Sequence, residues 1–144
     1  MSAPHDPSRL LALLPQKGVA LLLDRLESVE PGVSAIGWRT FPPGDRVFEG
    51  HLPGEPLVPG VAVIEALAQL SGCALVPAGF GQPISGYLAE VSRLRFRRLV
   101  RPGEPIRLSS RLRLRLGSAA RFEVEARVGE EVVAEGELTV GGMR

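Results

Sequence analysis

The chain contains very little cysteine, and this scarcity limits the chemistry that it can perform. Cys73 is the single cysteine among 144 residues, so an internal disulfide is impossible. It stands in an apolar stretch without the cysteine and histidine neighbours of a metal site, as an ordinary buried thiol does. We therefore expect no metal site and no catalytic role for Cys73.

Long hydrophobic runs and a basic leader are also lacking. Residues 1–7 contain no lysine or arginine, and the apolar stretch 10–14 is far shorter than the ~20 residues of a membrane-spanning helix. We therefore expect no signal peptide and no membrane association, and we predict a cytoplasmic protein. A length of 144 residues with 44% hydrophobic content suits one domain, predicted as residues 1–144.

Aromatic residues make up only 5% of the chain, and they are scarce where positive charge is concentrated. The net charge is +1, yet the segment from Arg93 to Arg121 holds ten arginines, one acid (Glu104) and one aromatic residue (Phe96). A platform for nucleic acid would interleave stacking aromatics with the basic residues. We therefore predict no nucleic-acid role. Most of these arginines are interpreted as a solvated strand face that pairs with acids on adjacent strands.

Proline and glycine divide the first half of the chain into short elements. Residues 7–14 are predicted as a short helix, and residues 19–30 and 34–41 as two strands joined by a tight turn at Pro31 and Gly32. Residues 46–59 contain too many prolines and glycines for a helix or an interior strand, so we expect a structured loop.

One helix, predicted over residues 61–76, has almost no polar side. Every position is apolar or small except Glu65, Gln69 and Ser71, which indicates a helix buried nearly all round. Glu65 and Gln69 are four residues apart and therefore share one face. Pro77 and Gly79 are expected to end the helix.

The second half alternates between apolar and charged residues with the period of a strand. Strands are predicted over residues 84–98, 106–116, 120–128 and 133–140. In the second of them Leu112, Leu114 and Leu116 are expected on the apolar face, opposite the arginines. With the first two strands, the sum is an antiparallel sheet of about six strands with one face covered by one long helix. The predicted class is α+β, a sheet wrapped around a buried helix.

The loop and the helix together hold residues suited to proton transfer. His51 lies at the start of a proline-stiffened loop, and Glu65 lies in the apolar helix that follows. A histidine can exchange protons near neutral pH, and a carboxyl in an apolar wall can be kept protonated and act as an acid. The pairing indicates acid–base chemistry.

Residues 48–69, FEGHLPGEPLVPGVAVIEALAQ, closely resemble the signature of the 3-hydroxyacyl-[acyl carrier protein] dehydratases of the hot dog fold. The similarity extends outward to residues 13–25, 87–89, 95–98, 102–103 and 132–135. The resemblance implies removal of water from a (3R)-3-hydroxyacyl thioester to give a trans-2-enoyl thioester, with no metal or cofactor. This reaction belongs to fatty acid biosynthesis or to polyketide and polyene assembly.

The resemblance also implies a role for each site residue. His51 is expected to take the proton alpha to the thioester carbonyl, and Glu65 to protonate the departing hydroxyl. The backbone amides of Gly60 and Val61, at the positive end of the helix, are expected to bind the thioester oxygen. Glycine at position 60 would let the substrate approach closely. Gln69 is expected to orient the carboxyl of Glu65.

The expected partners are an acidic acyl carrier protein and a second subunit. We expect a homodimer with one continuous sheet, in which histidine and acid of each site come from different subunits. A hexamer of such dimers and a heterodimer with a related chain stay open. For the carrier protein, the resemblance and the charge pattern suggest a binding face that consists of Arg93, Arg95, Arg97, Arg98 and Arg101.

Departures from the family pattern concern the substrate rather than the chemistry. Gln16 and Lys17 stand where histidine and arginine are common after a proline, and Leu52 replaces a common phenylalanine beside His51. Because position 52 adjoins the base, its change suggests a pocket for a different acyl chain, such as one used in polyketide or polyene assembly. Tyr87 is a candidate for lining the acyl tunnel. Alternative hypotheses are a hot dog thioesterase and a non-catalytic partner subunit of a heteromeric dehydratase.

Overall fold

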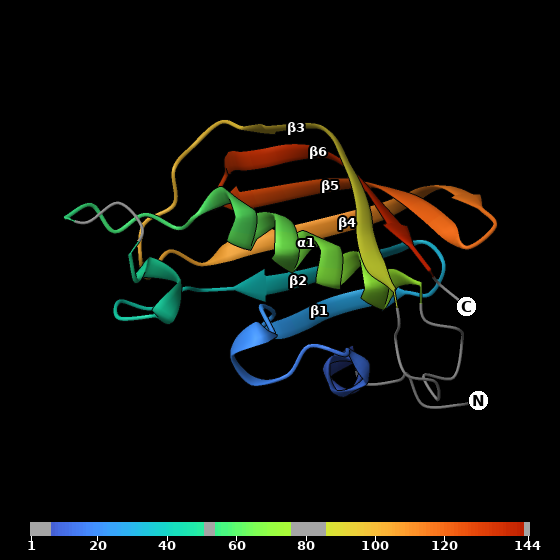
Figure 1. The fold of residues 1–144 in the computed structure, drawn as a ribbon, viewed down its shortest axis with the longest axis horizontal. Helices are drawn as coiled ribbons and strands as arrows, with labels where there is room; N and C mark the ends of the chain where they lie inside the picture. Colours follow the sequence, from blue (N-terminus) through green and yellow to red (C-terminus); the bar gives the residue numbers. More distant parts are fainter. Residues whose placement is uncertain (1–6, 51–53, 76–85, 143–144) are drawn as a thin grey trace.

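The computed structural model describes residues 7–50, 54–75 and 86–142. Within these ranges, the one α-helix, α1 (Gly60–Ala74), lies against a sheet of six strands (Figure 1). The strands are β1 (Arg25–Glu30), β2 (Ser34–Arg39), β3 (Tyr87–Phe96), β4 (Ile106–Leu116), β5 (Ala119–Val128) and β6 (Glu131–Gly141). They are ordered β1-β2-β4-β5-β6-β3, and all neighbours are antiparallel. This confirms the predicted α+β arrangement of about six strands around one helix.

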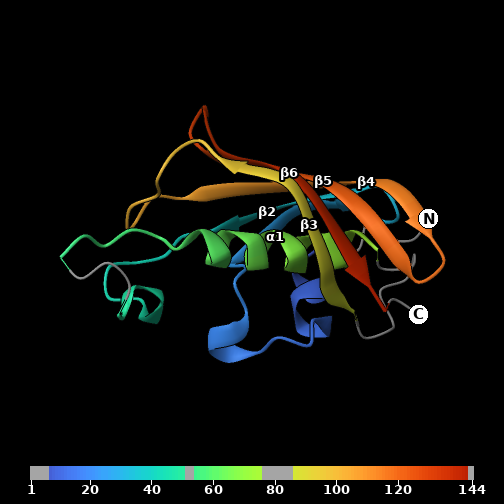
Figure 2. The same ribbon diagram turned by 45° about the horizontal axis from the view of Figure 1, so that its top comes forward.

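Three 3-10 turns complete the described secondary structure: η1 (Pro7–Leu13), η2 (Gly18–Ala20) and η3 (Arg46–Phe48). Figure 2 shows the sheet arching over α1, with η1 and η2 on the opposite side of the helix. The helix is therefore enclosed between two layers. In the described part of the chain, no helix is long and apolar enough to cross a membrane.

The core lies between α1 and the central strands. Leu67 and Leu70 of the helix and Leu108 of β4 have no exposed surface, and burial of each such side chain is worth about 1.5–3 kcal/mol. Gly37 of β2 allows close packing, because a Cβ there would lie 3.1 Å from Leu70 Cδ1. The near absence of polar residues on α1 is thus explained by the apolar side chains that surround this helix.

The first predicted strand is shorter than expected. Residues 18–20 form η2, and β1 begins only at Arg25. The physical reason is that the backbone at Ala20 and Leu22 pairs with the side chain of Gln69 rather than with a neighbouring strand. The prediction of a strand from residue 19 was wrong over its first half.

A β-bulge in β4 corrects a second expectation. Leu112 faces the buried Phe122 across the β4–β5 ladder, but the register shifts between Leu112 and Leu114. Leu114 then pairs with Arg121, so it lies on the face of the sheet away from α1. The exposed fractions are 44% for Leu114 and 67% for Leu116. Unbroken alternation in the sequence gave no sign of this bulge.

Strand β3 bends sharply where it passes from the end of the helix to the edge of the sheet (Figure 1). The register with β6 shifts between Ser92 and Arg95, and Arg93 has a positive φ of 53°. On β6, a Cβ at Gly136 would lie only 2.4 Å from Leu94 Cα. The bend therefore depends on glycine at position 136.

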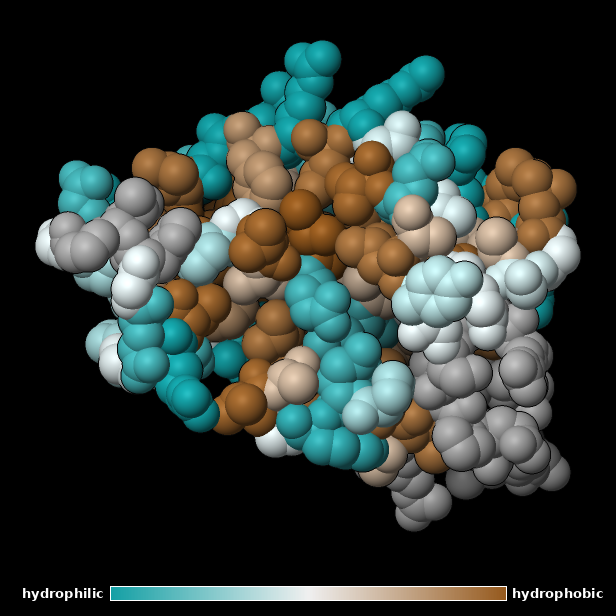
Figure 3. Space-filling model, in the orientation of Figure 1, coloured by the Kyte–Doolittle hydropathy of each residue, from teal (hydrophilic) through white to brown (hydrophobic). Residues whose placement is uncertain are grey.

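Apolar side chains remain exposed on the face of the molecule where α1 and β3 lie (Figure 3). The exposed large apolar residues on β3 are Tyr87, Leu88, Val91 and Phe96, and Val61 at the start of α1 and Leu99 after β3 are exposed as well. Strand β3 is an edge strand of the sheet, and its outer side has no partner strand among the described residues. Exposed apolar side chains along an unpaired edge strand are typical of an interaction surface.

Candidate active site

Glu65 and Gln69 lie on one face of α1 and contact each other. Gln69 is only 3% exposed, and its Nε2 donates to Glu65 Oε1 at 3.1 Å and to the carbonyl oxygen of Ala20 at 2.8 Å. Its Oε1 accepts the backbone N–H of Leu22 at 2.8 Å. The N–H of Leu22 can only donate and the carbonyl of Ala20 can only accept, so the amide has one possible orientation.

This orientation has a consequence for the carboxyl group of Glu65. Because Nε2 of Gln69 donates, Oε1 of Glu65 must accept. A proton on this carboxyl therefore belongs on Oε2, the oxygen that Gln69 does not contact. The side chain is partly buried, so it can meet a ligand.

A small hollow of about 50 Å³ adjoins Glu65 and Gln69. Ala68 and Gly72, both small, follow Glu65 along the same side of the helix and line it. Its other lining residues are Leu14, Pro15, Gln16, Gly86, Tyr87, Leu88 and Val140. Tyr87, a candidate for the acyl tunnel, is therefore beside the acid. A volume of this size is close to that of one or two water molecules, at ~30 Å³ each.

Gln16 is a site residue whose location the sequence did not indicate. It lines the hollow beside Glu65, and its Oε1 is buried without a hydrogen-bond partner in the described part of the protein. In the sequence it stood out only as a departure from the family pattern. Its place beside α1 depends on the path of the chain between η1 and η2, which no local pattern encodes.

The start of α1 presents two backbone amides. Pro59 is the N-cap and makes no side-chain cap, and no acceptor for the N–H groups of Gly60 and Val61 occurs among the described residues. A Cβ at position 60 would lie 2.9 Å from Cζ of Phe96. The space in the Cβ direction of Gly60 is thus filled by the Phe96 ring, and this contact by itself accounts for a glycine at this position. Close approach of a substrate at Gly60 stays a prediction.

His51 lies outside the described residues, so its distance from Glu65 is not given by the structure. The chain on either side is anchored. Asp45 caps η3, which ends at Phe48, and the N–H of Val58 donates to the carbonyl oxygen of Val100 at 2.8 Å. Within the described residues, no group of three or more histidine, cysteine or acidic side chains could hold a metal ion.

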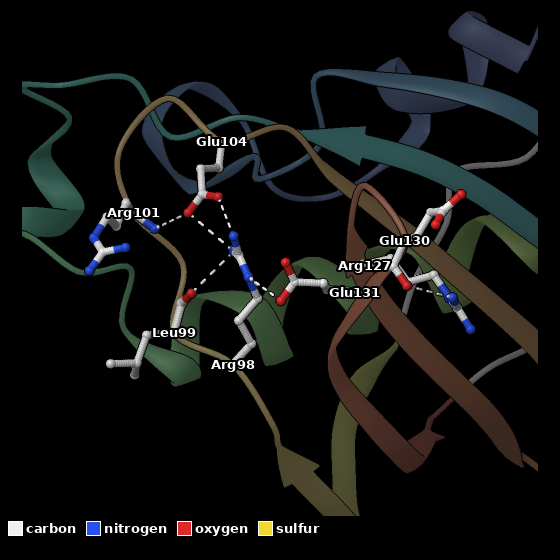
Figure 4. Close-up of polar contacts among 7 residues, drawn as sticks. All are labelled: Arg98, Leu99, Arg101, Glu104, Arg127, Glu130 and Glu131. Carbon is white, nitrogen blue, oxygen red and sulfur yellow. Dashed lines mark hydrogen bonds and ion pairs between the residues drawn. The ribbon is translucent and has the colours of Figure 1, made fainter.

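The arginines expected to face a carrier protein have different surroundings. Arg98 donates to Glu104 at 2.6 Å, to Glu131 at 3.2 Å and to the carbonyl oxygen of Leu99 at 3.2 Å (Figure 4). Its guanidinium, followed by the backbone amide of Arg101, holds the pKa of Glu104 below its usual value. Arg98 therefore fixes the connection between β3 and β4.

The other four arginines are more accessible. Arg97 pairs with Glu135 at 2.9 Å, while Arg93, Arg95 and Arg101 form no ion pair within the described residues. Arg93, Arg95 and Arg97 line one hollow of about 640 Å³ on the sheet face away from α1. Figure 4 shows the side chain of Arg101 pointing away from the network around Arg98. Of the ten arginines between Arg93 and Arg121, four form ion pairs within the described residues: Arg97, Arg98, Arg107 and Arg113. The other six are exposed, so the predicted pairing with acids is confirmed for part of this set only.

The sequence and the fold both match known dehydratases. A family model described as ApeI-like, ApeI dehydratase, matches residues 32–137. The 3-hydroxyacyl-[acyl-carrier-protein] dehydratase FabZ of Moorella thermoacetica is 38% identical over 133 residues, 92% of this chain and 93% of that protein. The chain belongs to the ApeI-like dehydratase family. FabZ of Clostridium acetobutylicum is 35% identical over 131 residues, 91% of this chain and 93% of that protein.

Solved structures of the same fold are more distant in sequence. The dehydratase heterocomplex ApeI:P from Xenorhabdus doucetiae matches this ApeI-like dehydratase with a TM-score of 0.76 at 20% identity, over 96% of this chain and 91% of that chain. The PaaI protein of E. coli matches with a TM-score of 0.62 at 13% identity, over 81% of this chain and 80% of that chain. These similarities concern the fold alone, and they confirm the hot dog fold.

Proposed function

We propose that this protein removes water from (3R)-3-hydroxyacyl thioesters carried on acyl carrier protein, giving trans-2-enoyl thioesters in the cytoplasm. Family membership and the FabZ relatives support the reaction class. The observation that supports the assignment most is the carboxyl of Glu65, partly buried on α1 and held through one oxygen by Gln69. This arrangement leaves the second oxygen to act on a substrate.

In the proposed reaction His51 is the base and Glu65 the acid. His51 takes the proton from C2 of the substrate, and the electrons of that C–H bond form the C2–C3 double bond. The C3–O bond breaks, and the hydroxyl leaves as water after receiving the proton from Oε2 of Glu65. Gln69 holds Oε1 as an acceptor and so keeps the acidic proton on the oxygen that faces the substrate.

The negative charge that develops on the thioester oxygen needs hydrogen-bond donors. We assign this role to the amides of Gly60 and Val61, because they lie at the positive end of a helix of 15 residues. The ring of Phe96 beside Gly60 would limit the thioester to the open side of this helix terminus. The three prolines at 53, 56 and 59 would restrict the loop between base and helix.

The proposed active form is a dimer in which two copies of β3 pair edge to edge. The unpartnered edge of β3 and its exposed apolar residues, Tyr87, Leu88, Val91 and Phe96, support this surface. His51 of one subunit would then meet Glu65 of the other. A heterodimer with a related chain is the second candidate, because the structurally similar ApeI:P dehydratase is a heterocomplex.

The proposed carrier protein would approach Arg93, Arg95 and Arg101, with Arg97 at the rim. Their exposed cationic side chains suit an acidic partner and would speed its encounter. Arg98 is omitted from this surface, because Glu104 and Glu131 already neutralise it.

The test is turnover of a 3-hydroxyacyl thioester on carrier protein, followed by mass. Wild type should lose water from the substrate, whereas His51→Asn and Glu65→Gln should not. Arg113→Met, which removes an exposed ion pair with Glu123, is the matched control and should retain activity. A folded wild type that releases free thiol would support a thioesterase instead. One that becomes active only with a related chain would support the heteromeric form.

A further inference from the structure

Arg39, at the end of β2, joins two segments that lead to the proposed acid and base. Its Nη1 donates to Asp24 Oδ1 at 3.0 Å and its Nη2 donates to Asp45 Oδ2 at 3.0 Å. The guanidinium also lies over the ring of Phe41, 4.5 Å from its centroid. The side chain is only 15% exposed, so these contacts are partly shielded from solvent.

Each carboxylate in turn orders the backbone. Asp24 Oδ2 accepts the N–H of Thr40 at 2.7 Å, and Asp45 Oδ1 accepts the N–H of Val47 at 2.9 Å. Asp45 is the N-cap of η3, which ends at Phe48, three residues before His51. The placement of η3 therefore depends on Asp45, and that of Asp45 on Arg39.

Asp24, the other partner of Arg39, lies next to the segment that contacts the proposed acid through Gln69. It follows the segment in which Gln69 binds the carbonyl of Ala20 and the N–H of Leu22. Gln69 also holds Glu65. A continuous line of contacts thus runs from Glu65 through Gln69, the segment 20–24 and Arg39 to η3.

The separation of the two joined segments is not set by packing alone. A hollow of about 640 Å³ lies between them, lined on one side by Leu21 and Leu22 and on the other by Val47. Arg39 also lines it. Because side chains do not fill this space, the two-sided contact of Arg39 adds to the packing in fixing the spacing.

A contribution to stability does not by itself explain the contacts of Arg39. Its Nε is buried without an acceptor in the described part of the chain, and an unpaired buried donor lowers the free energy of unfolding. Replacement of all partners of a shielded ion pair by apolar residues is often possible with no loss of stability, although removal of one partner alone is destabilising. The geometry is instead suited to holding two segments at a fixed distance.

We propose that Arg39 is a positioning residue for the dehydration. By bridging Asp24 and Asp45, it fixes η3, and hence the chain that continues to His51, relative to the segment that holds Gln69 and Glu65. This inference rests on the proposed function. In a dimer with shared sites, the same bridge would link the acid of one site to the base of the other.

The experiment compares Arg39→Met, Arg39→Lys and the control Arg107→Met, which removes a more exposed pair with Glu27 at 3.5 Å. For each, kcat, KM and the folded fraction are measured at the assay temperature. Arg39→Met should lower kcat about 10- to 100-fold with KM nearly unchanged, because misplacement by about 1 Å costs on that order. Arg39→Lys, with one compact ammonium in place of the fork, should recover part of the loss. Arg107→Met should stay within about twofold of wild type.

Amide hydrogen exchange supplies a readout that a purely stabilising role would not give. In Arg39→Met, peptides covering residues 41–50 should exchange faster, while those covering 60–74 should not change. The proposal is overturned if folded Arg39→Met retains wild-type kcat, or if exchange rises equally throughout the chain. If wild type itself lacks dehydratase activity, the proposed function fails first, and the exchange data then test the bridge alone.

Discussion

Replacement of Gln69 by leucine tests the contact on which the proposed acid depends. Gln69→Leu keeps the size of the side chain but removes three hydrogen bonds, to Glu65, Ala20 and Leu22. At about 0.5–1.5 kcal/mol net for each bond, the loss lies between about 1.5 and 4.5 kcal/mol. Because Ala20 is exposed, water can satisfy its carbonyl, and we expect the lower part of this range, about 2 kcal/mol.

Gln16→Leu is the matched control for this substitution. Both glutamines line the hollow beside Glu65, but the Gln16 oxygen is buried without a partner in the described structure. Its removal breaks no such bond, so the free energy of unfolding should change by less than about 1 kcal/mol. Urea denaturation of the three proteins measures both effects. Gln69→Leu should also lower kcat about tenfold, because Glu65 loses its orientation. Equal destabilisation by both substitutions would refute the argument.

Four further predictions concern the framework of the site. Gly136→Ala should destabilise by about 2–4 kcal/mol in thermal unfolding, because its Cβ would meet the backbone of Leu94 at 2.4 Å. Gly32→Ala should cost less, because a Cβ there meets no atom and only the positive φ of 75° is unfavourable. Ser110→Ala should cost about 1 kcal/mol: Ser71 donates to the carbonyl of Leu67, so Ser110 must donate to Ser71, and the Ser71→Ala/Ser110→Ala double variant should be less destabilised than additivity requires. Burial raises the pKa of Cys73 to about 12, so the folded protein should resist iodoacetamide at neutral pH and react once unfolded in urea; labelling of the native protein would contradict this. Arg98 lowers the pKa of Glu104 in the folded state. The stabilising effect of ionised Glu104 is therefore present above its unfolded pKa of about 4.3 and is lost as the pH falls through the lower folded pKa. The difference in unfolding free energy between wild type and Glu104→Gln should shrink over that acid range and stay constant near neutrality.

The sequence was sufficient where burial leaves a periodic pattern. The apolar positions of α1, interrupted by Glu65 and Gln69, predicted both the buried helix and its polar face, because a helix enclosed on all sides tolerates polar residues only where they have partners. The strands of the second half were predicted by alternation, because one face of the sheet is buried and the other is exposed. The turn at Pro31 and Gly32 followed from local backbone preferences.

What the sequence did not predict depends on long-range contacts. The bulge beside Leu114 leaves the alternation of residue types intact, so the reversal of faces is visible only in the pairing with β5. The turn at residues 18–20 is fixed by Gln69, far along the chain, and the bridge from Arg39 to Asp24 and Asp45 joins segments that are separate in sequence. Gln16 likewise lies beside Glu65 only because the fold brings these distant positions together.

Mixing two inactive variants tests the central claim most directly. His51→Asn and Glu65→Gln chains are each expected to be inactive on a 3-hydroxyacyl thioester carried on acyl carrier protein. In a mixed dimer with shared sites, one site keeps both His51 and Glu65, so co-expressed chains should regain about a quarter of the wild-type rate if subunits associate at random and sites are independent. Native mass spectrometry confirms that mixed dimers are present. Mixed dimers that form no enoyl product, or a single variant that retains the wild-type rate, would contradict the account.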